Sequence, residues 1–194
     1  MDSTRRYFLA SFLALPALAP QALFGQENAP AQLALTPECG DAEPTPAQSE
    51  GPFFMPRTPL KRDFAADAPE GTKITVAGYV LTQDCRPVPD ALVELWHADE
   101  EGEYDNEGFR LRGHQFTDAA GRWWFETIVP GLYPGRTRHF HVKVLRPGGE
   151  VLTTQLYFPG EEANRQDFIF DPALLLDIAR APDGGYARFD FVVA

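Results

Sequence analysis

The sequence contains little cysteine, little positive charge and no long apolar run beyond its N-terminus. Its two cysteines, Cys39 and Cys85, do not form a CxxC pair, which excludes thiolate zinc sites and iron–sulfur clusters built by this chain alone. The 17 Lys and Arg residues face 28 Asp and Glu, for a net charge of -11, which excludes a nucleic-acid binder that works by neutralising phosphates. No later segment has eighteen apolar residues in a row, so no stable membrane insertion is expected.

Residues 1–25 are typical of an export signal rather than of a folded domain. Paired arginines, Arg5 and Arg6, precede an apolar run that is short for a bilayer span. The string TRRYFL resembles the twin-arginine signature of folded bacterial exports, and an ordinary secretory signal is the alternative. We therefore expect a periplasmic or extracellular protein. In such an oxidising compartment Cys39 and Cys85 are candidates for a disulfide, with two separate thiols as the alternative.

A proline-rich arm over residues 26–70 precedes a domain over residues 71–194, whose sequence pattern predicts β structure. Short segments with a two-residue alternation of apolar side chains are separated by Gly, Pro, Asp and Asn. The expected strands are KITVAGYVLT, ALVELWHA, RWWFETIV, RHFHVKVL, VLTTQLYF and RFDFVVA, and only DPALLLDIAR looks helical. Strands without alternating helices predict an all-β fold, an antiparallel β-sandwich with short helical and loop elements.

The HFH string places two imidazoles on one face of a strand. Alternate residues of a strand share a face, so His139 and His141 point the same way and can converge on one metal ion. Phe140, Val142 and Val144 would face the apolar core on the opposite side. The alternative is a solvated edge strand on which the two histidines have no ligand.

The histidine pair belongs to one of four motifs that occur together, in order, along this sequence. They are LVELWHADEEGEYD with Tyr104, FTDAAGRWWFETIVPGLYP with Tyr133, RTRHFHVKV with the two histidines, and TTQLYFPG. From Gly51 to Gly160 the chain resembles the intradiol ring-cleavage dioxygenases, the family of protocatechuate 3,4-dioxygenase and catechol 1,2-dioxygenase. The resemblance implies a prealbumin-like sandwich, homo-oligomers, and an enzyme that uses O2 to cleave a catechol to a cis,cis-muconate type diacid.

The same resemblance implies one non-haem Fe(III), held by two tyrosinates, two histidines and a hydroxide. Carried over to this sequence, the protein ligands are Tyr104, Tyr133, His139 and His141. Elementary chemistry agrees, because a hard ferric ion suits phenolate oxygen and neutral imidazole nitrogen. Zinc or copper, which the histidines would also accept, is the alternative metal.

The resemblance also implies roles for further residues. Arg136, three residues before His139, matches a catalytic arginine, and Tyr133 matches the tyrosinate that leaves the metal when substrate binds. Gln155 matches a glutamine behind the metal ligands. The string SEGPFF resembles a substrate-lining stretch, which makes candidates of Gly51, Pro52 and Phe53.

Two departures from the family pattern leave the particular catechol open. The stretch RLRGHQFTD is shorter than in the protocatechuate enzyme, and Gly135 stands where that enzyme carries a tryptophan. The remaining histidines, His97 and His114, are expected outside the metal site. The alternative function is an exported transthyretin-like sandwich that binds a ligand without catalysis, since this scaffold also serves non-enzymes.

Overall fold

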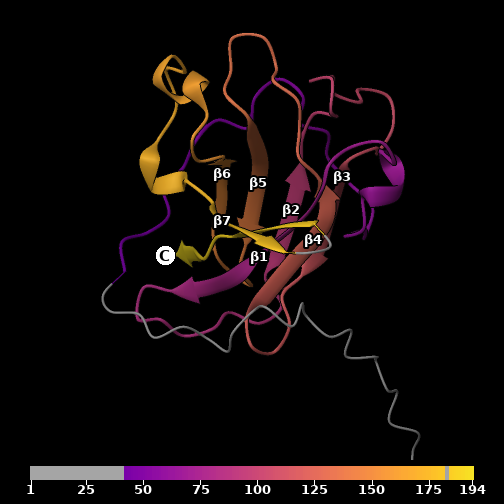
Figure 1. The fold of residues 1–194 in the computed structure, drawn as a ribbon. Coiled ribbons are helices and arrows are strands. Elements are labelled where there is room, and N and C mark those ends of the chain that lie inside the picture. Colours follow the sequence, from indigo (N-terminus) through magenta and orange to yellow (C-terminus); the bar gives the residue numbers. More distant parts are fainter. Residues whose placement is uncertain (1–41, 182–183) are drawn as a thin grey trace, which may run out of the picture.

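The computed structural model describes residues 42–181 and 184–194, which form two β-sheets packed on one another (Figure 1). The predicted export signal and Cys39 lie outside these residues, so the expected signal and the Cys39–Cys85 disulfide both stay predictions. Within the described ranges no helix is long and apolar enough to cross a membrane.

The strands divide into a five-stranded and a four-stranded sheet. The first, in the order β4-β1-β8-β7 with β9 also paired to β1, contains β1 (Lys73–Thr82), β4 (Arg122–Ile128), β7 (Asp177–Ala181), β8 (Gly184–Arg188) and β9 (Phe191–Val193). The second, in the order β3-β2-β5-β6, contains β2 (Leu92–Trp96), β3 (Arg112–Phe116), β5 (His139–Leu145) and β6 (Val151–Tyr157). The described residues also contain three short 3-10 helices, η1 (Ala65–Asp67), η2 (Glu162–Arg165) and η3 (Pro172–Leu174).

Alternation along the strands produces the core between the two sheets. Val76 of β1 and Phe125 of β4 are fully buried from one side, and Val93 of β2 with Phe140 and Val142 of β5 are fully buried from the other. Burial of such side chains is the main stabilising contribution, roughly 1.5–3 kcal/mol each. The β-sandwich predicted from the alternation is confirmed.

Two local expectations were wrong. The predicted helix DPALLLDIAR is only one 3-10 turn, capped by Asp171, whose carboxylate accepts a hydrogen bond from the Ala173 amide at 2.9 Å, and then the strand β7. Pairing with β8 fixes the end of this segment as a strand, and its short apolar run ALLL could not distinguish the two structures. The predicted strand RFDFVVA is also divided, since β8 ends at Arg188 and β9 begins at Phe191. Both of these strands run parallel to β1.

The chain before β1 crosses the outer face of the four-stranded sheet, and we call residues 46–60 the covering segment. The Gln48 amide donates to the Thr153 carbonyl of β6 at 2.8 Å. The Thr58 hydroxyl donates to Glu94 of β2 at 2.6 Å, and Leu60 forms a bridge beside β3. Contacts with β6, β2 and β3 in turn show that the segment spans the sheet, so this face is not open to solvent.

Candidate metal centre

One row of paired residues crosses the sheet beneath the covering segment. Trp96 of β2 pairs with Arg112 of β3 on one side and with His141 of β5 on the other. His141 in turn pairs with Gln155 of β6. Because paired residues of neighbouring strands point to the same face, all four side chains project toward the covering segment.

The two predicted histidines converge and are buried. His139 is 4% and His141 2% exposed, and their Nε2 atoms lie 3.1 Å apart. Phe140 and Val142 occupy the core on the opposite face, as the alternation predicted. The solvated-edge interpretation of the HFH string is therefore wrong, because the covering segment buries this face.

The two imidazole rings are oriented by different interactions. His139 Nδ1 lies 2.6 Å from the Thr137 carbonyl, which can only accept, so Nδ1 carries the proton and the Nε2 lone pair faces His141. The ring of His141 instead stacks on Trp96, with ring centroids 5.0 Å apart and planes 6° from parallel. Its Nδ1 is buried and has no hydrogen-bond partner among the described residues. Packing rather than a hydrogen bond therefore orients His141.

Both imidazoles are electrically neutral at pH 7. Burial lowers the pKa of His139 to about 4, and burial together with the neighbouring His139 lowers the pKa of His141 well below its usual value. A neutral imidazole keeps a lone pair on one ring nitrogen, which is the form that binds metal ions. The pair therefore presents two nitrogen donors at one point.

Gly51 of the covering segment lies directly against His141. A Cβ added to Gly51 would lie 3.2 Å from His141 Cε1, and its φ of +70° is a left-handed conformation that costs a non-glycine residue about 1–2 kcal/mol. We expect Gly51→Ala to lower the free energy of unfolding by this amount, measured by denaturant titration, and to disturb the metal site through His141. Gly148→Ala is the matched control, because Gly148 has a φ of +71° and open space around its Cβ position. Equal behaviour of the two variants in metal binding would contradict the contact.

Tyr104 joins the histidine pair. Its Oη lies 3.3 Å from His139 Nε2, and its ring stacks on Phe53 at a centroid distance of 4.4 Å. Tyr133 packs edge-on against both rings, at 5.9 Å from Tyr104 and 5.3 Å from Phe53. The structure thus brings Tyr104, His139 and His141 into direct contact and places Tyr133 beside them.

The loops that carry Tyr104 and Tyr133 contact each other closely at two glycines, Gly102 and Gly131. The Gly131 amide donates to the Asp99 carbonyl at 2.6 Å, and a Cβ on Gly102 would lie 2.4 Å from the Leu132 carbonyl oxygen. The Asp99 carboxylate also accepts from the backbone amides of its own loop and pairs with Arg110 at 2.7 Å. The backbones that carry the two tyrosines therefore hold one relative position.

These residues fit a ferric ion. Two nitrogen atoms 3.1 Å apart match ligands of a single ion when each bond is about 2.1 Å long. Burial raises the pKa of Tyr104 above its usual value, and Arg136 and Arg112 only partly oppose this, so the phenol stays neutral without a metal. A bound cation would favour the phenolate, which is the donor that hard Fe(III) prefers.

Arg136 contacts Gln155, the β6 residue paired with His141, in a network that fixes the direction of its guanidinium. Its Nη2 donates to Gln155 Oε1 at 2.6 Å, and its Nε donates to the carboxylate of Asp167 at 2.8 Å. Burial alone would raise the pKa of Asp167, but hydrogen bonds from the Thr137 and Ile169 amides and from Arg136 outweigh it and lower that pKa. Arg136 and Gln155, which were predicted separately, are thus adjacent, whereas no sequence motif predicts Asp167.

The other histidines serve the fold. His97 is buried, with Nδ1 2.7 Å from the Ala98 carbonyl and Nε2 2.7 Å from the Thr127 hydroxyl, so both ring nitrogens are satisfied. His114 contacts Thr58 of the covering segment at 3.3 Å. Both lie outside the centre, as expected.

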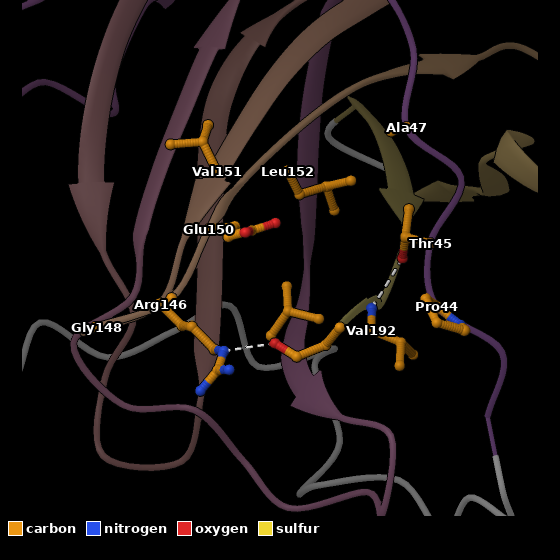
Figure 2. A pocket seen from close by; sticks show the side chains of 12 residues that line it. Pro44, Thr45, Ala47, Arg146, Gly148, Glu150, Val151, Leu152 and Val192 are labelled. Carbon is orange, nitrogen blue, oxygen red and sulfur yellow. Dashed lines mark hydrogen bonds between the residues drawn. The ribbon is translucent and has the colours of Figure 1, made fainter.

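A separate cavity of about 520 Å³ lies near the end of the sandwich (Figure 2). Its walls are residues of the chain before β1, of the turn between β5 and β6, and of β9. There the Arg146 Nε donates to the Ala194 carbonyl at 2.6 Å. No predicted metal ligand lines this cavity, so its size does not make it the functional site.

Comparison with known proteins agrees with the geometry. The family model described as Dioxygenase matches residues 49–192. A solved structure, the dioxygenase domain of a dioxygenase carbohydrate-binding protein fusion from Streptomyces sp. SirexAA-E, is 52% identical, with a TM-score of 0.76 over 78% of this chain and 98% of that one.

Curated relatives carry dioxygenase names with different substrates. Hydroxyquinol 1,2-dioxygenase of Nocardioides simplex is 32% identical over 80% of this chain and 66% of its own length. The protocatechuate 3,4-dioxygenase beta chain of Burkholderia cepacia is 36% identical over 58% of this chain and 57% of its own. The chain thus spans about 55–66% of the length of these first relatives. The protein belongs to the dioxygenase family, and its relatives place it among the intradiol ring-cleaving members.

Proposed function

We propose that this protein is a non-haem Fe(III) dioxygenase that cleaves a catechol-type diol with O2 to a cis,cis-muconate type diacid. The observation that carries the proposal is the convergence of Tyr104 Oη with the Nε2 atoms of His139 and His141 beneath the covering segment. The match of the family model over 49–192 supports the same conclusion and does not favour the alternative of a non-catalytic sandwich.

Four side chains would hold the iron: Tyr104, Tyr133, His139 and His141. When bound, ferric iron activates a chelated catechol for reaction with O2. The protein supplies the fixed positions, through the Thr137 carbonyl behind His139 and the Trp96 ring behind His141.

Arg136 and Tyr133 would act on the substrate. The guanidinium of Arg136, oriented by Gln155 and Asp167, provides positive charge beside the centre and binds an anionic catecholate. Tyr133 is half-buried beside Phe53 and Tyr104, and as a phenolate its oxygen would accept a proton from a substrate hydroxyl. Phe53, with Gly51 and Pro52 of the covering segment, would form the roof of the substrate pocket.

From the sequence we also propose export through a twin-arginine route and, from the family resemblance, assembly into homo-oligomers. The choice among catechol, protocatechuate and hydroxyquinol is likewise a proposal, because the named relatives differ in substrate.

A visible absorption spectrum tests the function. We expect protein purified with iron to show a tyrosinate-to-Fe(III) band, and this band to shift on anaerobic addition of one among catechol, protocatechuate and hydroxyquinol. Admission of O2 should then consume that substrate and yield the diacid. Zinc in place of iron would leave the protein colourless, and a protein that stays colourless after reconstitution with ferric iron would contradict the ligand assignment.

A further inference from the structure

Arg112 is a buried cation in the same cross-strand row as His141. It begins β3, pairs with Trp96, and is only 1% exposed. Removing a guanidinium from water costs several kcal/mol unless its charge and its N–H groups find partners. Arg112 therefore needs partners that offset this cost. In the proposed function it is neither a metal ligand nor a substrate contact.

The contacts of Arg112 are backbone carbonyls rather than acids. Its Nη1 donates to the Phe53 carbonyl at 2.8 Å, and its Nη2 donates to the carbonyl of Asp105. The Asp105 carboxylate is occupied elsewhere, since it accepts from the amides of Glu107, Gly108 and Arg110. Among the residues that the structure describes, no carboxylate forms an ion pair with Arg112.

The two carbonyls belong to the two segments that meet at the metal centre. Phe53 lies in the covering segment, and its ring stacks on the ring of Tyr104 at 4.4 Å and 15°. Asp105 directly follows Tyr104 in the loop after β2. A single planar guanidinium, with donors at fixed angles, thus connects the backbone of Phe53 to the backbone next to Tyr104.

We propose that Arg112 is a positioning residue that clamps Phe53 against Tyr104 and so fixes the orientation of the Tyr104 phenol toward the iron. This inference rests on the proposed function and goes beyond it, because it assigns a task to a residue outside the ligand set.

Two substitutions separate the effect of the two hydrogen bonds of Arg112 from the effect of its positive charge. Arg112→Lys keeps a positive charge but lacks the planar fork that reaches both carbonyls, and Arg112→Met removes both. Arg122→Met is the matched control, because Arg122 begins β4 in the other sheet and pairs with Asp118. For each protein we would measure ferric iron affinity by competition with a chelator, the wavelength of the tyrosinate–iron band, and the thermal unfolding of the metal-free form.

We expect Arg112→Met to bind ferric iron about 10- to 100-fold more weakly than the wild type, with a shifted absorption band. Arg112→Lys should show a smaller loss and also a shifted band, and Arg122→Met should match the wild type. Should Arg112→Met fail to fold, Arg112→Lys decides alone, since a wild-type band and affinity in that variant would overturn the clamp. A wild-type protein that binds no ferric iron would instead overturn the proposed function, and with it this inference.

Discussion

His141→Ala is expected to abolish ferric iron binding and to lower the rate of catechol cleavage by about 10³-fold or more. His141 supplies one of two neutral nitrogen donors whose Nε2 atoms lie 3.1 Å apart, and its ring fills the space between the covering segment and Trp96. A bound metal ion provides several kcal/mol of transition-state stabilisation, and each 1.36 kcal/mol is a factor of about ten in rate. Metal analysis of the purified variant and its visible spectrum give the direct measurement.

The control for this prediction is His114→Ala. His114 projects from β3 to the same face of the sheet, but it contacts Thr58 rather than the metal centre. It should retain iron and colour. Circular dichroism of both variants establishes that the folds are intact, and a His141→Ala protein with full iron content and activity would remove His141 from the ligand set.

Arg136→Met is expected to lower kcat by about 10²- to 10³-fold, the range seen when one oriented donor is removed from a charge-stabilising site. Stability should fall as well, because the Asp167 side chain is only 1% exposed and would lose its cation. Breaking such a buried pair costs about 3 kcal/mol or more, and the unfolding temperature should drop by roughly 6–12 °C. Stopped-flow kinetics and calorimetry measure the two effects.

A second substitution separates catalysis from stability. Asp167→Asn removes the buried negative charge and keeps one side-chain oxygen, which can accept the hydrogen bond from only one of the Thr137 and Ile169 amides, because these donate to different carboxylate oxygens of Asp167. The double variant Arg136→Met with Asp167→Asn should regain part of the lost stability, because it no longer buries an unpaired charge, while its kcat stays low. If kcat recovered together with stability, Arg136 would be a structural residue only.

The fold and the candidate site were predictable where one short stretch of sequence determines them. The two-residue period of HFH placed Phe140 in the core and brought His139 and His141 to one face. Tyr104 and Tyr133 stand in glycine-containing turns, and their sequence motifs were sufficient to nominate them. For the histidines, the alternation of the strand decides where the side chains point. The tyrosines were nominated by the family resemblance of their motifs, and contacts with the distant Phe53 hold their rings.

The remaining features depend on contacts between distant parts of the chain. Nothing in the composition of residues 46–60 shows that they cross the sheet, because their partners lie on β6, β2 and β3. The roles of Arg112 and Asp167 follow from the same crossing and from the loop after β6, so no local pattern reveals them. The sequence pattern does not predict β3, since RGHQF has few apolar residues, and it favours a helix over the segment that contains β7.

The covering segment also sets the order in which the centre can form. Gly51 and Phe53 come from before β1, Tyr104 from after β2, and Asp167 from after β6, so the site combines pieces from nearly the whole described chain. Contacts between such distant segments form late, after the entropy of closing long loops has been overcome. A chain in which residues 46–60 have not yet docked would leave the sheet face that carries His139 and His141 uncovered, without the packing of Gly51 on His141 and of Phe53 on Tyr104. The proposed iron site would therefore reach its final packing only when folding is complete.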